Sequence, residues 1–201
     1  MTNLVSRAEY KNYMNISKST DDTKIDQLCT SISALVKTYC GVSFIDYWDA
    51  DKTEYFNINA TNVNCVFLDE NPIRSITSVS ERTSRSQAYT VLVGDGTDDK
   101  YEYEIDLAIG ILYRTNETGY TPFPKGIKAV EVTYKSGYVS TPNDLKLAIF
   151  DMIRYYLNNE YKDRQSVVNA SIVNSTGSSI KDDTGFPDHI TRVLDLYKVN
   201  V

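Results

Sequence analysis

The feature that most constrains the fold is a change in the spacing of apolar residues that occurs twice along the 201-residue chain. Residues 25–39 and 145–157 repeat apolar side chains at i, i+3, i+4 and i+7, the spacing of one face of an α-helix. Residues 42–138, between them, instead alternate apolar and polar positions with the period of two typical of β-strands. The sequence therefore predicts two long amphipathic helices separated by a β module.

The two apolar stripes predict a helical bundle, because each large side chain buried in a core contributes about 1.5–3 kcal/mol and needs a packing partner. Ser19 or Thr20 is expected to cap the first long helix, and Gly41 stands at the position of a left-handed C-terminal cap. Thr141 is expected to cap the second, with Pro142 at its first helical position. The residues expected to pack the bundle are Ile25, Leu28, Ile32, Leu35, Leu145, Ile149, Met152 and Tyr156.

Two shorter helices are expected near the ends of the sequence. Ser6 and Glu9 have the spacing of a capping box, in which each side chain accepts a hydrogen bond from the other residue's backbone N–H. A last helix is expected to start at residues 186–188. Together with the long helices, these elements predict a discontinuous bundle of about four helices, built from residues 1–41 and 139–201.

The middle of the chain predicts an antiparallel sheet, because short strands follow one another closely and are joined by turn residues. The fold class is therefore α+β, a helical bundle with an inserted antiparallel β-sandwich or small barrel over residues 42–138. The 16 tyrosines suit a sheet whose aromatic side chains cover a core while their hydroxyls stay in water. The expected strands cover residues 54–58, 63–68, 73–79, 88–93, 101–107, 109–114 and 127–134.

Residues 162–186 have neither period and consist mainly of Ser, Asn, Asp and Gly around two short apolar clusters. A structureless segment longer than about 15 residues inside a compact protein is usually functional or disordered. Two interpretations stay open for this segment. It is either a flexible arm that orders on a partner, for example by adding a strand to a neighbour's sheet, or an untethered loop in solvent.

The residues needed for nucleophilic or metal chemistry are scarce. His189 is the only histidine, and its place in the first turn of the last helix favours a surface or capping role. Cys29, Cys40 and Cys65 are odd in number and share no C-x-x-C spacing, which argues against a disulfide framework. We expect these thiols to behave as small buried apolar groups.

The acidic residues give no stronger signal. Asp95, Asp98 and Asp99 lack the ligand spacing of a calcium loop, and a hairpin turn is the simpler interpretation. Glu102 and Glu104 alternate along one strand, as expected on the solvent face of an antiparallel sheet. Glycine-rich phosphate-binding motifs are also missing from the sequence. The sequence therefore predicts no catalytic residue, no metal site, no cofactor and no enzymatic activity.

The formal net charge of −6 argues against a general nucleic-acid binder, because neutralising phosphates requires clustered Lys and Arg. An acidic surface would instead repel a passing duplex. No apolar run reaches the roughly 18 residues of a membrane-spanning helix, and the first residues lack a signal-peptide pattern. We therefore expect a protein that folds in a cytoplasm and has no membrane partner.

Four stretches, taken in order, resemble the tailed-phage head-tail connector (adaptor) family. The most specific is the strand Val130–Tyr138 with its Gly-Tyr turn, which leads to Pro at the start of an amphipathic helix. Each stretch is weak alone, and their order carries the resemblance over most of residues 8–160. The other three are Tyr10–Tyr13 followed by Asp21-Asp22 and the helix 25–39, the junction Tyr39–Phe44, and the strand entry Glu70–Ile76.

The resemblance implies a structural virion protein that forms a ring, commonly twelve-fold, between the portal and the tail. It implies a dodecamer that docks to the portal protein, offers a platform to downstream tail or ring proteins, and lets DNA pass through its lumen without sequence-specific contact. Such a subunit would sit at the neck of the virion and assemble in the bacterial host cytoplasm. Helices 20–40 and 142–160 would also pack against ring neighbours. The residues expected to contact the portal or a neighbour are Arg164, Val167, Val168, Ile172, Val173, Lys181, Tyr197, Val199 and Val201.

A second class of function stays open beside the connector. The chain could be another virion β protein, such as a tail, receptor-binding or carbohydrate-binding module, that uses the aromatic sheet as a ligand platform and the helices as a docking base. Binding of glycans by the purified monomer would favour this class. Neighbouring genes for a portal and a capsid protein would favour the connector.

Overall fold

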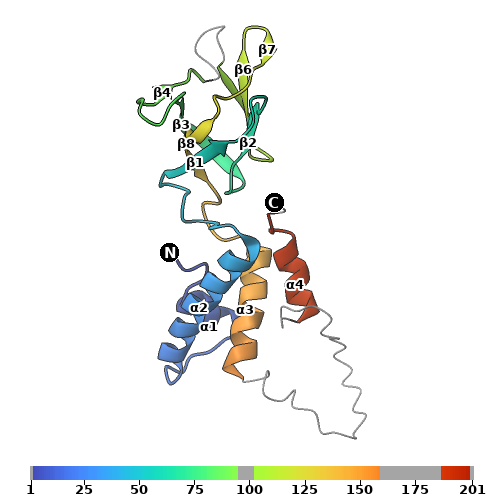
Figure 1. Cartoon of the computed structure of the whole chain (residues 1–201). Coiled ribbons are helices and arrows are strands. Elements are labelled where there is room, and N and C mark those ends of the chain that lie inside the picture. The colour runs from blue at the N-terminus through green and yellow to red at the C-terminus, as the bar shows by residue number, and fades with distance from the viewer. Residues whose placement is uncertain (1, 95–101, 159–186, 200–201) are drawn as a thin grey trace, which may run out of the picture. The chain divides into compact units, whose positions relative to one another are not determined.

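The computed structural model describes residues 2–94, 102–158 and 187–199. The chain divides into two compact units: a helical unit formed by residues 1–42 and 140–201, and a β unit formed by residues 43–139. Within the described residues there are four helices and two antiparallel sheets of four strands each (Figure 1). The α+β fold class predicted from the sequence is confirmed.

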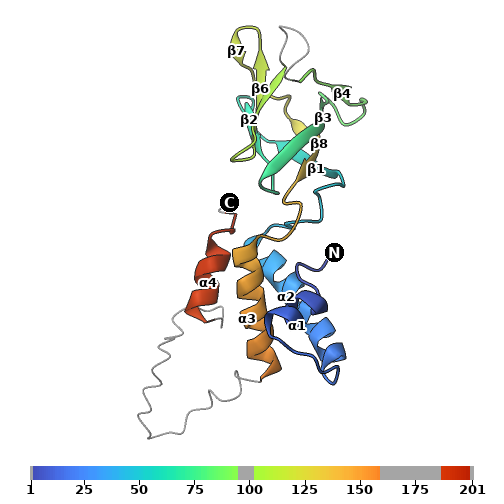
Figure 2. The same ribbon diagram turned by 180° about the vertical axis from the view of Figure 1, so that it is seen from behind.

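The helical unit is built on the two long helices predicted from the apolar stripes. In both views α3 lies between α2 and α4, and α2 also contacts α1 (Figures 1 and 2). A search of the helices among the described residues finds none that could span a membrane. The helices are α1 (Arg7–Tyr13), α2 (Asp22–Cys40), α3 (Asn143–Leu157) and α4 (Asp188–Asp195).

The caps predicted from the sequence are found at some helix ends and not at others. The Ser6–Glu9 capping box is present, and Gly41 caps α2 with a left-handed φ of 72°. At the other ends the prediction is corrected by one or two residues: Asp21 is the N-cap of α2, and Pro142 that of α3. The Thr141 hydroxyl instead donates a 2.6 Å hydrogen bond to the carbonyl oxygen of Leu4, so it fastens the N-terminal segment.

Most of the expected bundle residues are buried within the helical unit. Ile25, Ile32, Leu145, Ile149 and Met152 are each at most 2 % exposed. Leu28 and Tyr156 are half-buried, and Leu35 is exposed.

Leu35 is 39 % exposed because the buried face of α2 is turned toward the N-terminal segment. Ser33 and Lys37 are buried on that face, although both are polar. The Ser33 hydroxyl accepts a 2.9 Å hydrogen bond from the backbone N–H of Leu4, and the Lys37 amine donates a 2.8 Å bond to the carbonyl of Thr2. The segment that precedes α1 therefore covers a flank of α2 that the apolar pattern does not mark.

The β unit consists of two antiparallel sheets, sheet A with strand order β1-β8-β3-β4 and sheet B with order β2-β6-β5, in which β7 also pairs with β6 (Figure 2). One hydrophobic core contains side chains from both sheets, which makes the unit a sandwich. Within the described residues neither sheet closes into a barrel. The strands are β1 (Lys52–Ile58), β2 (Cys65–Phe67), β3 (Ile73–Glu81), β4 (Thr90–Val91), β5 (Tyr103–Asp106), β6 (Ile111–Asn116), β7 (Gly119–Tyr120) and β8 (Gly126–Ser136).

Two details of the β unit differ from the sequence prediction. Strand β7 was not predicted, because a strand of two residues is too short to show an alternating pattern. Tyr134, on β8, is completely buried and its hydroxyl bonds to a carboxylate rather than to water. The expectation that the tyrosine hydroxyls stay wet is therefore wrong at this position.

The Gly-Tyr turn after β8 is fixed by close backbone contact. Gly137 has a φ of 89°, which L side chains rarely adopt, and a Cβ at this position would overlap the carbonyl oxygen of Phe44. The same Phe44 carbonyl accepts a 2.7 Å hydrogen bond from the N–H of Tyr138, and the N–H of Gly137 donates a 2.8 Å bond to the carbonyl of Pro72. A glycine is therefore required where β8 ends.

Candidate functional site

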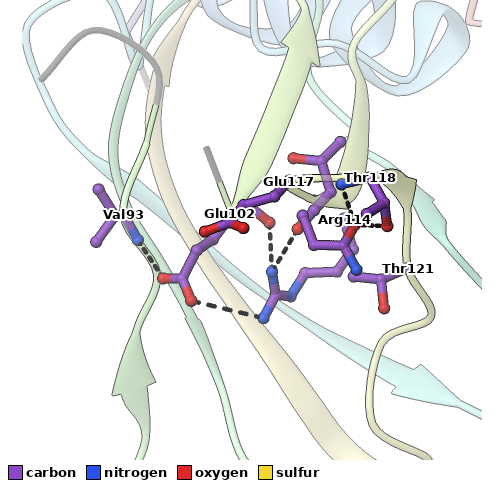
Figure 3. A pocket seen from close by; sticks show the side chains of 8 residues that line it. Val93, Glu102, Arg114, Glu117, Thr118 and Thr121 are labelled. Carbon is purple, nitrogen blue, oxygen red and sulfur yellow. Dashed lines mark hydrogen bonds and ion pairs between the residues drawn. The ribbon is translucent and has the colours of Figure 1, made fainter. Parts of the chain in front are cut away.

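A shallow hollow of about 560 Å³ lies beside β6 and β7 in the β unit (Figure 3). Its centre is the guanidinium of Arg114, which is largely buried. A cationic side chain in a hollow is a common feature of anion-binding sites. The lining residues are Val93, Glu102, Arg114, Thr115, Asn116, Glu117, Thr118 and Thr121.

The Arg114 guanidinium is committed to partners within the protein. Its Nε and one Nη donate to the two oxygens of Glu81, both at 3.0 Å, which is the bidentate geometry of a strong arginine–carboxylate pair. The other Nη donates to the backbone carbonyls of Glu102 at 2.6 Å and Thr115 at 2.8 Å (Figure 3). The carboxylate of Glu102 accepts a 2.8 Å bond from the N–H of Val93. These contacts tie β3 to β6, so the arrangement is structural rather than a phosphate site.

A second charged cluster is buried inside the β unit. The amine of Lys52 lies 2.6 Å from a Glu54 oxygen and 3.5 Å from Glu70. Glu54 also accepts a 2.5 Å hydrogen bond from the Tyr134 hydroxyl, and Glu70 accepts bonds from both the N–H and the hydroxyl of Ser43, at 2.8 and 2.6 Å. Each charged group in the cluster therefore has partners, which is the condition for burying it at tolerable cost.

The pKa values of two groups in this cluster, Tyr134 and Lys52, are both raised. Burial raises the pKa of Tyr134 strongly, and the neighbouring Glu54 carboxylate raises it further. For Lys52, burial alone would lower the pKa, but the hydrogen bond and charge of Glu54 more than offset this and raise it. A neutral tyrosine and a fully protonated lysine cannot serve as bases near pH 7.

Two of the three thiols are buried as expected, whereas Cys65 is half-buried, which corrects the prediction for that residue. Burial raises the pKa of Cys29 to about 11 and that of Cys40 to about 12, which leaves both as unreactive thiols. His189 is well exposed, with its Nε2 atom 3.8 Å from Asp151. Among the described residues, no group of three or more His, Cys, Asp or Glu side chains is placed to hold a metal ion.

The end of the described chain is fastened to the helical unit. The Tyr197 hydroxyl donates to the two oxygens of Asp144, at 2.7 and 2.9 Å, and the N–H of Val199 donates a 3.1 Å bond to the carbonyl of Cys40. Tyr197 and Val199 thus hydrogen-bond to residues of their own helical unit, and their contact with a partner stays a prediction. The other residues expected to contact a partner, Arg164, Val167, Val168, Ile172, Val173, Lys181 and Val201, lie outside the described residues, as do Asp95, Asp98 and Asp99.

Sequence reasoning missed both charged clusters of the β unit. Arg114 is 33 residues from its partner Glu81, and Glu54 is 80 residues from Tyr134. No local spacing marks such pairs, and Glu54 shows in the sequence only as part of an alternating strand. The alternation itself was a usable signal, because it places Glu54 on the same face as the apolar Phe56 and Ile58.

The charged groups of both candidate sites are bonded to partners within the β unit. The similarity of the chain to known proteins therefore says more about its function than either site does. A model of the head completion protein family matches residues 3–200, nearly the whole chain. The chain belongs to the head completion protein family. The resemblance to head-tail connector proteins seen in the sequence is confirmed at this level.

The fold of this family member is also found in solved structures. The neck of an empty gene transfer agent (GTA) particle, computed with C6 symmetry, contains a chain with a TM-score of 0.60 and 14 % identity, covering 98 % of this chain and 91 % of that one. The neck of a native GTA particle, computed with C12 symmetry, gives a TM-score of 0.55 at 15 % identity over 100 % and 97 % of the two chains. The virion of the native GTA particle contains a chain with a TM-score of 0.59 and 12 % identity, covering 98 % of this chain and 91 % of that one. No curated protein matches the sequence.

Proposed function

We propose that the protein is a structural head-tail connector, an adaptor subunit in the neck of a tailed-phage-like particle. The observation that carries this proposal is the membership of the head completion family over residues 3–200. The matched chains in GTA necks support it, because they cover 98–100 % of this chain, and both the helical unit and the β unit fall inside the match. The proposal therefore concerns the whole chain rather than one module.

The subunits are proposed to form a ring, a dodecamer, between the portal protein and the downstream tail or ring proteins. The C12 and C6 symmetries of the matched neck structures support a cyclic arrangement. The net charge of −6 supports a lumen through which DNA passes without being held, since an acidic wall repels phosphates. The ring would be assembled in the cytoplasm of a bacterial host and carried in the virion neck.

The interior of the β unit supports a structural role. The charged groups that would attract attention in an enzyme, Lys52, Glu54 and Arg114, are each bound to partners in their own unit. No set of nucleophile, base and orienting group converges among the described residues. We therefore assign the chain an assembly function and no reaction step.

Electron microscopy of the purified protein, alone and mixed with its portal protein, tests this proposal. We expect rings of about twelve subunits, formed alone or on the portal, as in the C12 neck. A protein that stays monomeric under both conditions would contradict the proposal. Specific binding of the monomer on a glycan array, combined with that failure, would instead favour a carbohydrate-binding virion module.

A second experiment tests residues 162–186 as the contact segment. Deleting Gln165 to Lys181 removes five of the six expected contacts in this segment, Val167, Val168, Ile172, Val173 and Lys181, and leaves the four described helices intact in sequence. We expect the shortened chain to keep its helical content and lose ring or portal association in size-exclusion chromatography. Unchanged assembly would show that the segment is a solvent loop. Substituting the same residues by a Gly-Ser linker of equal length is the matched control for the shortened connection.

A further inference from the structure

The outward surface of sheet B is apolar, although it faces solvent. Val66 and Leu112 point into the sandwich core, so by strand alternation their neighbours point away from it. Those neighbours pair across the sheet: Phe67 lies opposite Ile111, and Cys65 lies opposite Tyr113. We call the outward side chains of Cys65, Phe67, Ile111, Tyr113 and Tyr120 the apolar face.

The apolar face is unusual for an antiparallel sheet with one solvated side. Such sheets normally carry polar side chains outward. Here Phe67 and Tyr120 are each 64 % exposed, and Tyr120 packs on Tyr113 with ring centroids 5.4 Å apart. The turn that joins β5 to β6 carries two more exposed apolar side chains, Leu107 and Ile109. An apolar surface of this kind marks an interaction site.

The border of the apolar face is acidic. Strand β5 is the edge of sheet B, and its outward side chains are Glu104, opposite Tyr113, and Asp106, opposite Ile111. Both carboxylates belong to exposed residues. Two such faces brought together would place like charges side by side, which costs association energy. The expected partner surface is therefore one with positive charge around apolar or aromatic groups.

The outward surface of sheet A has this complementary chemistry. Tyr55 and Tyr89 lie with ring centroids 6.4 Å apart, the Lys128 amine lies 4.8 Å from the centre of the Tyr55 ring, and the Arg82 guanidinium 4.6 Å from that of Tyr89. Lys135, further along β8, points the same way by alternation from the buried Tyr134. We call these five side chains the cationic face.

Hydrogen bonds hold part of the cationic face, and the face has a positive balance of charge. The Lys128 carbonyl accepts hydrogen bonds from Arg82 at 3.0 Å and from the Tyr89 hydroxyl at 2.7 Å, and its N–H donates a 2.8 Å bond to Asn57. Glu131, on the same side of β8, is the acidic residue beside Tyr55. Three cations therefore outnumber this one carboxylate, and the fixed backbone reduces the entropy lost on binding.

We propose that the apolar face of one subunit docks on the cationic face of the next subunit in the ring, with Glu104 and Asp106 meeting Lys128 and Arg82. This inference rests on the proposed connector function. The two sheets share one core, so their outward faces point in opposite directions. A contact between different faces of identical subunits is heterologous and propagates from copy to copy until a ring closes, as an isologous dimer contact cannot.

Charge reversal tests this pairing in the full-length protein. Glu104→Lys and Lys128→Glu each place like charges at every contact, and we expect each to weaken ring assembly at least about tenfold. The chain carrying both substitutions restores opposite charges at each contact and should regain assembly. Asp49→Lys is the matched control for Glu104→Lys, because it makes the same change of charge in the β unit at a well-exposed site outside the apolar face.

Alkylation of Cys65 gives a second measurement that does not depend on charge. Cys65 lies on the apolar face and is half-buried in the monomer, whereas Cys29 and Cys40 are buried in the helical unit. Assembly should slow the labelling of Cys65 by at least about tenfold, as expected for a site from which a packed interface excludes solvent. Phe67→Ser should abolish both ring formation and this protection while leaving the unfolding midpoint of the monomer nearly unchanged, because Phe67 points outward.

The outcomes separate this inference from the function on which it rests. Rings formed as readily by Glu104→Lys, Lys128→Glu and Phe67→Ser as by the unsubstituted chain would overturn the docking scheme and leave the connector function standing. Loss of assembly in both single variants without recovery in the combined chain would also overturn the pairing of these two faces. Absence of rings in the unsubstituted chain, even with its portal, would overturn the connector function and the docking scheme together.

Discussion

The helical unit and the β unit stabilise their charged groups in different ways. In the helical unit two ion pairs, Arg7 with Asp26 at 2.5 Å and Lys146 with Glu9 at 2.6 Å, are partly exposed. A third, Lys11 with Asp22 at 2.6 Å, is more buried, with side-chain exposures of 17 % and 26 %. In the β unit the Lys52 and Glu54 side chains are only 19 % and 9 % exposed. The Lys52–Glu54 pair of the β unit therefore has a larger energetic weight than the Arg7–Asp26 pair of the helical unit.

This difference follows from the geometry of the two architectures. A helix exposes one side along its whole length, so long charged side chains reach water while the apolar stripe is buried. In a small sandwich, the inward positions near the end of a strand meet loops whose backbone groups need hydrogen-bond partners. Glu54 and Glu70 supply acceptors there, for the N–H groups of Asp69 and Ser43 respectively. Lys52, 2.6 Å from Glu54 and 3.5 Å from Glu70, offsets part of their charge.

The largest effect is expected from the apolar stripe of α3. Ile149 is completely buried, so Ile149→Ala should destabilise the protein by about 2–5 kcal/mol through lost burial and the cavity left behind. Leu147, two residues earlier on the same helix, is 46 % exposed, and Leu147→Ala should cost about 0.5 kcal/mol or less. Urea unfolding followed by circular dichroism measures both. Equal effects of the two substitutions would contradict the assignment of the buried face.

The next effect contrasts the two units directly. Glu54→Gln leaves the Lys52 amine without its nearest carboxylate in a largely buried position and should cost about 3 kcal/mol. Asp26→Asn removes an ion pair of similar length from the helical unit, where side-chain exposures of 42 % and 53 % limit the expected loss to about 1 kcal/mol or less. Urea unfolding of both variants at pH 7 gives the comparison. A larger loss for Asp26→Asn would reverse the distinction drawn between the units.

A smaller effect separates two glycines with positive φ. Gly41, the cap of α2, has φ of 72°, and among the described residues no atom lies within 4 Å of the position that an added methyl group would take. Gly41→Ala should therefore cost only about 1 kcal/mol of backbone strain. Gly137→Ala adds overlap with the Phe44 carbonyl and should cost about 2 kcal/mol or more. Thermal unfolding of the two variants tests this order, and a less stable Gly41→Ala chain would argue against the close approach at the end of β8.

The features predicted from sequence are those that repeat locally. The stripe of α2 and the Ser6–Glu9 box each lie within one helix, where spacing alone fixes which side chains meet. Leu35 shows the limit of this reasoning, because the flank of α2 that is buried depends on residues 2–5, which show no helical pattern. The bidentate pair of Glu81 with Arg114 also depends on residues distant in the sequence, because it joins two strands that belong to different sheets. The sequence therefore did not predict which distant residue pairs with a polar residue at a buried position.

The smallest effect is a pH dependence in the helical unit. Burial alone would raise the pKa of Glu9, but the hydrogen bonds that its carboxylate accepts from Lys146 and Ser6 outweigh burial and hold the pKa below its ordinary value of 4.5. The folded state therefore binds the proton less readily than the unfolded state. The stabilisation is complete well above pH 4.5 and disappears as the pH falls through the folded-state pKa.

A double-mutant cycle between Glu9 and Lys146 isolates this contribution. Glu9→Gln, Lys146→Met and the combined variant should show a small favourable coupling by urea unfolding at pH 7, because the ion pair is partly exposed. At pH 3 the coupling should shrink, since the carboxylate is then increasingly protonated in the folded state as well. A coupling that persists undiminished at pH 3 would mean that the contact acts by packing rather than by charge.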